Sequence, residues 1–391
     1  MATLWIAQFL SQFGDSVFQL AFIWLLLDLT GSKSATGLAA TISYLPSLLF
    51  GIAAGLLVDR WNRRRVMMGA DAARALLLAL CAFLYVAHVL TPPLLIAVAF
   101  GVSTSAVLFY PARDAMLPEL VPPEGLNRAN AFVQLSQYGA LFAGPSLAGW
   151  LIQVFGVGSA FPTAAVFFAG SLLTLLFLRG AGTGHRSEQE RVGLVQDFRT
   201  GLAAIVADRP LVLLLILTAL DNLFIMGPAI LGNAVIVRDD LHLGASAYAM
   251  VEAAYGISMI LGSLTVGRLG ARLGYGRLLL LGIVLDGVTY IPLLACRSLA
   301  FLIVVSLIHA LAIPMITIPR ATLVQRHVPP RLQGRVFALV NLVVLGTTAV
   351  SSGLAGLLLD HMTAPVLFGW IGSLAGATGL LGFLSGRLRR L

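Results

Sequence analysis

Residues Gly55–Val66 read GLLVDRWNRRRV and place five charged side chains within seven residues. The stretch lies between long runs that carry almost no charge, since residues 75–112 and 129–178 contain no Asp, Glu, Lys or Arg. Each of these runs is long enough for two helices that cross a bilayer, because one such helix needs about 20 apolar residues. A short charged turn between apolar runs is typical of a polytopic membrane protein.

The composition points to the same class. Of the 391 residues, 59% are hydrophobic and 11% are charged, whereas soluble domains carry about 25% charged residues. The net charge of +8 does not indicate nucleic-acid binding, because the basic residues separate the apolar runs and form no stripe with interleaved aromatics. Cys81 and Cys296 fall inside apolar runs without metal-ligand spacing, so we expect no metal site. The N-terminal stretch is predicted to be a retained first span rather than a cleaved signal peptide.

Hydropathy, with Gly, Pro and charged residues as breaks, predicts an all-α fold with twelve transmembrane helices. The predicted spans are 3–29, 36–58, 66–90, 93–113, 127–154, 158–180, 211–236, 245–267, 277–296, 298–319, 335–359 and 363–386. An even number of spans places both termini on one side. Of the 25 Lys and Arg residues, 22 fall in segments on that side, and the positive-inside rule makes it cytoplasmic. We therefore expect a multi-pass protein of the inner (cytoplasmic) membrane with both termini in the cytosol.

The chain also repeats itself. Val121–Pro123 and Arg128 recur as Val328–Pro330 and Arg335, each at an offset of 207 positions. Two parallel six-helix repeats with a substrate path at their interface are the architecture of one large transporter class. The predicted domains are an N-terminal six-helix bundle (1–180), a cytoplasmic linker (181–210) and a C-terminal six-helix bundle (211–391).

The opening stretch resembles the cytoplasmic signature of the major facilitator superfamily, Gly-x-x-x-Asp-Arg-x-Gly-Arg-Arg. Five positions match this signature: Gly55, Asp59, Arg60, Arg63 and Arg64. Asn62 stands where the superfamily usually has Gly, and Asn tolerates the left-handed backbone better than most residues. The resemblance covers essentially the whole chain and implies two pseudo-symmetric bundles that give alternating access to a central cavity.

In that superfamily the charged turn acts as a latch between the two halves. The resemblance implies that Asp59 lies near the N-terminus of the eleventh span, where the helix dipole favours negative charge, with Arg60 and Arg64 as its partners. Asp71 and Arg74 are three residues apart, and we interpret them as an intrahelical pair near the cytosolic end of the third span that supports the latch. The alternative is that these charges only set the topology.

A second signature lies in the fifth span, where Tyr138–Trp150 reads YGALFAGPSLAGW and resembles the Gly-Pro-x-x-Gly-Gly motif of proton-coupled drug exporters. The matching residues are Gly144, Pro145 and Gly149, with Ala148 in place of the first Gly of the final pair. Ala140, Gly144 and Ala148 share one face that lets another helix approach closely, and Pro145 permits a kink. The alternative is tight packing without directional meaning.

Polar residues form a face on the first span. Gln8, Gln12, Asp15 and Gln19 follow one another at spacings of four, three and four residues, which places them on one side of a helix. A polar stripe does not face lipid, so we expect it to face protein or a water-filled cavity. Asp15 lies about 18 Å into its helix at 1.5 Å per residue, which is near the bilayer middle.

The repeat makes Asp221 the mate of Asp15, and we expect no Lys or Arg at this depth to pair with either acid. Desolvation disfavours the charged form of a buried carboxylate, so such a group can bind and release protons. Asp286 is interpreted as a structural hydrogen-bonding residue, and His309 as a cavity-lining residue of little diagnostic value. Alternatively, each acid is a permanently protonated packing element. The candidate proton-coupling or substrate-binding residues are Asp15, Asp221, Glu252, Gln12, Gln19, Asn222, Tyr44, Tyr110, Gln134 and Tyr255.

These features predict a secondary active exporter of amphipathic or cationic organic compounds, driven by a proton gradient and needing no cofactor. The regions around 113–130 and 319–341 further resemble the superfamily branch that holds siderophore and macrolide exporters. We expect a monomer in the lipid bilayer with a small-molecule substrate. A lipid flippase or a solute importer of the same fold is the alternative. An enzyme or receptor is least supported, because the sequence has neither Gly-x-x-x-x-Gly-Lys-Ser/Thr nor His-Glu-x-x-His.

Overall fold

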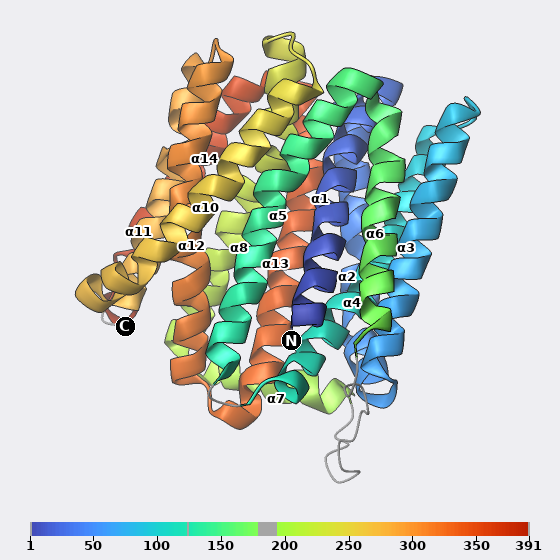
Figure 1. Cartoon of the computed structure of the whole chain (residues 1–391). Coiled ribbons are helices and arrows are strands. Elements are labelled where there is room, and N and C mark those ends of the chain that lie inside the picture. The colour runs from blue at the N-terminus through green and yellow to red at the C-terminus, as the bar shows by residue number, and fades with distance from the viewer. Residues whose placement is uncertain (1, 123–124, 179–193, 390–391) are drawn as a thin grey trace. The chain divides into compact units, whose positions relative to one another are not determined.

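The computed structural model describes residues 2–122, 125–178 and 194–389, and these residues form helices and connecting turns without strands (Figure 1). Within this part of the chain, eleven helices are long and apolar enough to cross a membrane. Helix α2 (Lys33–Arg60), with 28 residues, occupies the remaining predicted span. The predicted all-α fold with twelve spans is therefore confirmed.

The chain divides into two compact units. Unit 1 comprises Met1–Ser32, Ile42–Gln189 and Gly244–Gly256, and unit 2 comprises Lys33–Thr41, Glu190–Leu243 and Ile257–Leu391. Helices α2 and α10 contribute residues to both units, and the units differ in this way from the predicted bundles 1–180 and 211–391. Residues 181–193 of the predicted linker lie outside the described residues, and most of its remainder forms helix α7.

Unit 1 is built mainly from five helices. Their bounds are α1 (Ala2–Thr30), α3 (Arg63–Val86), α4 (Pro92–Leu120), α5 (Leu126–Phe155) and α6 (Ala160–Leu176). Prolines at the first two positions of α4 and the capping side chain of Asn62 before α3 mark two of the helix starts.

Unit 2 contains the helices of the second half of the chain. Their bounds are α7 (Leu194–Ala207), α8 (Arg209–Gly227), α9 (Asn233–Val235), α11 (Tyr275–Val288), α12 (Leu299–His327), α13 (Pro330–Leu359), α14 (Ala364–Gly382) and α15 (Gly386–Arg389), and α10 is Ala245–Leu273. The seventh predicted span is less regular than expected. After Pro228 it continues as the π-helical turns Pro228–Gly232 and Ile236–Asp240, because proline removes one backbone donor.

The sequence repeat has a counterpart in helix packing. In unit 1, α1 packs against α5 and α6, and α3 packs against α4 and α6. In unit 2, α8 packs against α13 and α14, and α11 packs against α12 and α14. Since α8 and α11–α14 follow the repeat of α1 and α3–α6, the two units use the same set of helix pairs.

Each unit has its own apolar core. In unit 1 the core joins residues from six helices, α1 to α6, among them Met67 on α3, Phe109 on α4 and Leu175 on α6. In unit 2 it includes Leu279 on α11 and Leu323 on α12. Polar side chains meet between α1, α3 and α4 in unit 1, and between α8, α11 and α12 in unit 2.

Candidate functional site

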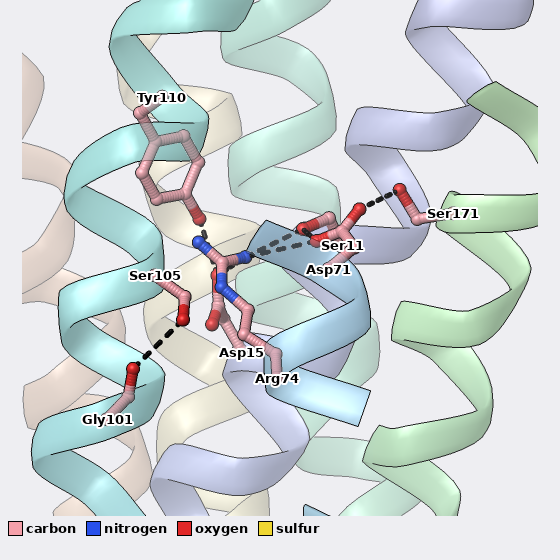
Figure 2. A network of polar contacts seen from close by, with 8 residues as sticks. All are labelled: Ser11, Asp15, Asp71, Arg74, Gly101, Ser105, Tyr110 and Ser171. Atoms are coloured by element: carbon pink, nitrogen blue, oxygen red, sulfur yellow. Dashed lines mark hydrogen bonds and ion pairs between the residues drawn. The ribbon is translucent and has the colours of Figure 1, made fainter. Parts of the chain in front are cut away.

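A buried arginine organises the polar site of unit 1. Arg74 lies midway along α3 and is fully buried. Its Nη1 atom lies 3.5 Å from Asp15 Oδ2 on α1 and 3.5 Å from Asp71 Oδ1, and it donates to Ser11 Oγ at 2.9 Å (Figure 2). The prediction that Asp15 has no basic partner is therefore wrong. The run without charged residues begins after Arg74, but α3 begins at Arg63, so Arg74 lies at the midpoint of the helix.

Asp71 is held by side chains from three helices. It is fully buried, and it accepts hydrogen bonds from Ser11 Oγ on α1 at 3.0 Å and from Ser171 Oγ on α6 at 2.5 Å. The predicted contact with Arg74 is present, but it lies in the interior of unit 1 and not near an end of α3. Asp71 thus fixes α1, α3 and α6 around one carboxylate.

Asp15 is the accessible acid of this network. Its side chain is 26% exposed, whereas those of Arg74 and Asp71 are at 0%. Tyr110 on α4 donates its hydroxyl to Asp15 Oδ2 at 2.6 Å (Figure 2). The Arg113 guanidinium lies 5.0 Å from the centroid of the same tyrosine ring. A proton or a cation that reaches this network would therefore meet Asp15 first.

Aromatic rings surround the rest of the Arg74 guanidinium. Its central carbon lies 5.0 Å from the Phe109 centroid, 5.1 Å from that of Phe168 and 5.7 Å from that of Tyr110. Its Nε and Nη2 atoms have no hydrogen-bond partner, so cation–π attraction supplies part of the stabilisation that hydrogen bonds would otherwise give. The site thus combines two carboxylates with one fixed positive charge.

The glutamines of the predicted polar stripe lie in three different environments. Gln8 is buried and donates to Ser136 Oγ on α5 at 3.2 Å, so it serves the contact of α1 with α5. Gln12 is buried, and its Oε1 atom has no hydrogen-bond partner. Gln19 is exposed. Only Asp15, of the four stripe residues, joins the Arg74 network by a described contact.

Other predicted site residues of unit 1 lie apart from that network in their described contacts. Glu252 on α10 is hydrogen-bonded to Tyr248, whose ring stacks on Trp24 of α1 with centroids 6.2 Å apart. Tyr255 is buried. Tyr44 is half-buried, and Gln134 is exposed.

Unit 2 places a second polar cluster on α8, α11 and α12. Asp221 and Asp286 are both buried and in hydrogen-bonding contact with each other. His309 Nε2 lies 3.5 Å from Asp286 Oδ1, and the Arg320 guanidinium acts electrostatically on Asp221. Asn222 bonds instead within its own helix, donating to the Thr218 carbonyl at 2.9 Å. Asp221 was predicted as a site residue, but its partners were not. The one sequence signal for them was a pair of ionisable residues on two consecutive apolar spans.

The charged turn of the opening stretch contacts helix ends within unit 1. Asn62 has φ −64° and accepts from Arg65 N at 3.0 Å, so it caps α3 in extended backbone and not in the left-handed region anticipated from the sequence. Arg63 donates to the Ala115 carbonyl at 2.9 Å and pairs with Glu119.

Arg64 contacts the last turn of α6. It donates to the Leu175 and Leu176 carbonyls at 2.8 Å and 2.6 Å. Carbonyls at helix C-termini lack intrahelical partners, and arginine satisfies them. The surroundings of Gly55, Asp59 and Arg60 are not among those that the structure describes, so the latch stays a prediction.

The small residues of α5 lie where other helices come close. Ala140 and Ala148 are buried, and Pro145 lies inside the helix. A Cβ atom at Gly144 would lie 2.5 Å from Ser16 Cβ on α1, and one at Gly149 would lie 2.3 Å from Ala249 Cβ on α10. These glycines therefore permit the close approach of α1 and α10 to α5. Among the described residues, no group of His, Cys, Asp and Glu could hold a metal ion.

The sequence matches the family described as "transmembrane secretion effector" over residues 1–389. Among its relatives, macrolide efflux protein A of Streptococcus pyogenes is 25% identical over 369 residues, which cover 92% of this chain and 89% of the relative. The multidrug efflux pump Tap of Mycobacterium tuberculosis is 34% identical over 199 residues, covering 48% of this chain and 46% of the pump.

Solved structures show the same fold. The nucleoside transporter NupG has a TM-score of 0.78 at 13% identity, covering 98% of both chains. A bacterial homologue of the iron transporter ferroportin in an inward-facing state has a TM-score of 0.76 at 16% identity, covering 98% of this chain and 96% of the other. With the family match over nearly the whole length, the chain belongs to the transmembrane secretion effector family of the major facilitator superfamily, in the drug-exporter branch, and is a membrane transporter and not an enzyme.

Proposed function

We propose that this transporter exports amphipathic or cationic organic compounds in exchange for protons, by alternating access. It acts as a monomer in the cytoplasmic membrane with both termini in the cytosol, and the proton gradient is its energy source. The names of its relatives, macrolide efflux protein A and multidrug efflux pump Tap, support export of organic compounds. The observation that carries the proposal is the charge balance of the Asp15, Asp71 and Arg74 network.

This network has one negative charge too many when both acids are ionised. Arg74 lies 3.5 Å from each of two carboxylates, and one guanidinium balances only one of them. An uncompensated charge beside fully buried groups is costly. Uptake of one positive charge at Asp15, the partly exposed acid, removes the imbalance.

A proton and an organic cation would neutralise the same carboxylate. Binding of either therefore weakens the binding of the other, which is the requirement for exchange of a substrate against a proton. Tyr110 donates to Asp15 at 2.6 Å, so the carboxylate keeps one protein partner when a proton leaves and a cation takes its place.

The test is uptake of the cationic dye ethidium into inside-out membrane vesicles from a bacterial host, with an imposed pH gradient that is acid inside. Exchange predicts that ethidium accumulates, that nigericin collapses the accumulation together with the gradient, and that an added macrolide competes. Asp15→Asn removes the carboxylate that the proton and the cation share, so this variant should lose gradient-driven ethidium accumulation.

Asp360→Asn is the matched control, because Asp360 is exposed at the end of α13 and should leave accumulation unchanged. Ethidium uptake that is indifferent to the pH gradient would contradict proton exchange. Accumulation in right-side-out vesicles instead would favour the importer alternative. A lipid flippase would move labelled phospholipid and not the dye.

A further inference from the structure

Unit 2 contains two buried carboxyl groups that face each other. Asp221 on α8 is 5% exposed, and Asp286 on α11 is 3% exposed. Their side chains are in hydrogen-bonding contact. Ionised carboxylates accept hydrogen bonds and donate none, so this contact is favourable only when one of the two acids carries a proton.

The imidazole of His309 lies beside Asp286, and its two nitrogen atoms have different roles. Its Nδ1 atom lies 3.1 Å from the Asp286 backbone carbonyl, which only accepts, and 3.1 Å from Thr289 Oγ1. Because Thr289 Oγ1 already donates to the Leu285 carbonyl at 2.6 Å, both contacts require hydrogen on Nδ1. A neutral ring then has its lone pair on Nε2, which lies 3.5 Å from Asp286 Oδ1.

The ring of His309 cannot turn away from this arrangement. It stacks on Tyr290 with centroids 3.8 Å apart and an interplanar angle of 17°, and Tyr290 packs against Phe368 of α14. His309 itself is 1% exposed. The imidazole Nε2 atom is thus fixed toward the Asp286 carboxyl group.

The charges around the acid pair are few. Arg320 on α12 is the positive group that acts on Asp221. Of the other main helices packed against α8, α14 has no charged residue, and α13 has only Arg331 and Arg335, both in its first two turns. With Arg320 charged and His309 neutral, the cluster has no net charge when one proton is bound to the acid pair.

Two oxygen atoms of the pair receive no hydrogen bond from an N–H or O–H group of another residue. These are Asp221 Oδ1 and Asp286 Oδ1, although both side chains are more than nine-tenths buried. Buried polar atoms are usually paired, so these atoms mark a place where a proton is gained and lost. The nearby Nε2 of His309 offers a second position for that proton.

We propose that Asp221, Asp286 and His309 form a proton-binding site that holds one proton shared between the two carboxyl groups. Arg320 balances the remaining negative charge, and His309 Nε2 accepts the proton from Asp286 when it leaves the pair. This proposal rests on the proposed function, and the site would be the unit 2 counterpart of the Asp15 site. It comes from α8, α11 and α12, the helices that repeat α1, α3 and α4 of the Asp15 site.

The test is infrared spectroscopy of the purified protein in lipid films, titrated from acid to alkaline pH in H2O and in D2O. A shared proton gives a carboxylic-acid C=O band that shifts on exchange into D2O. Either Asp221→Asn or Asp286→Asn should remove the same component of this band at neutral pH, because the Asn amide donates to the remaining carboxylate in place of the proton. The double variant should show no further loss, and Asp360→Asn should keep the band.

The outcome that overturns the site is loss of half the band in each single variant, which would mean two separately protonated acids. A band that is identical in the wild type and in the double variant would overturn it too. If the Asn variants do not fold, the wild-type titration decides, because a wild type without an exchangeable carboxylic-acid band has no shared proton.

The same spectra separate this site from the proposed function. Asp15→Asn should keep the band component that Asp221→Asn removes, and it should lose gradient-driven ethidium accumulation. Wild-type transport that ignores the pH gradient, with the band present, would contradict proton exchange and leave the site in place. Gradient-driven transport without the band would contradict the site alone.

Discussion

Arg74 is the residue whose removal should do most damage to unit 1. Without its guanidinium, the Asp15 and Asp71 carboxylates would lose the positive charge that lies 3.5 Å from each. Breaking a buried ion pair by deleting one partner costs about 3–5 kcal/mol. We therefore expect Arg74→Met to lower the free energy of unfolding by about that amount, measured by SDS titration of the protein in mixed micelles with circular dichroism.

The second variant for this prediction is Arg74→Met combined with Asp71→Asn. Removing the fully buried acid together with its partner should recover part of the lost stability, since coupled neighbours are not additive. An Arg74→Met protein as stable as wild type would show that the guanidinium does not stabilise the network. A double variant less stable than Arg74→Met would show that Asp71 is held by Ser11 and Ser171 alone.

The sequence predicts individual site residues better than it predicts the contacts between them. The helical spacing of α1 identified Asp15 as an interior acid, because periodicity is a local property. Its partner Arg74 was missed, because that contact joins helices α1 and α3 and hydropathy counts an arginine as a boundary. His309 was set aside for the same reason, since nothing in its own helix indicates that Asp286 lies 3.5 Å away.

At the scale of the helix, α5 contains two glycines whose replacement by alanine should affect stability differently. A Cβ at Gly149 would lie 2.3 Å from Ala249 Cβ on α10, whereas the nearest atom to a Cβ at Gly139 is Phe9 Cε2 at 3.7 Å. Overpacking costs about 1–3 kcal/mol. We expect Gly149→Ala to destabilise the protein by about that amount and Gly139→Ala, its matched control, to leave stability unchanged or slightly raised, since Ala favours helix.

The measurement is again SDS titration, with ethidium accumulation as a second readout. Gly149→Ala should lose both stability and transport, because α10 must move away from α5 to admit the new methyl group. Equal stability for the two variants would show that α10 adjusts at no cost and that Gly149 is not required for the contact.

The helices themselves were largely predictable. Every backbone polar group must be satisfied within the bilayer, so long apolar runs become helices whatever their neighbours are. The exceptions lie where proline acts, as at Pro228, after which the seventh span continues through π-helical turns. Such turns depend on how freed carbonyls find new donors, and hydropathy carries no information about that.

For the whole molecule, the repeat is seen both in the helix packing and in the position of a polar cluster in each unit. Unit 1 places Asp15 on α1, Asp71 and Arg74 on α3, and Tyr110 on α4. Unit 2 places Asp221 on α8, Asp286 on α11 and His309 on α12, which are the helices that repeat α1, α3 and α4. Asp221 corresponds to Asp15 in the repeat, whereas the partners of the two acids differ. What the two units share is a pair of acids near one arginine.

The orientation of the whole chain can be tested at the two ends of α3. This helix has 24 residues and is about 36 Å long at 1.5 Å per residue, so its ends lie on opposite sides of a hydrocarbon core of about 30 Å. Trp61 before it and Thr91 after it are exposed, while both native cysteines are buried. Because most basic residues lie on the Trp61 side, a membrane-impermeant maleimide should label Thr91→Cys in intact cells and Trp61→Cys only after permeabilisation. Labelling of Trp61→Cys in intact cells would reverse the topology and, with it, the direction of proposed transport.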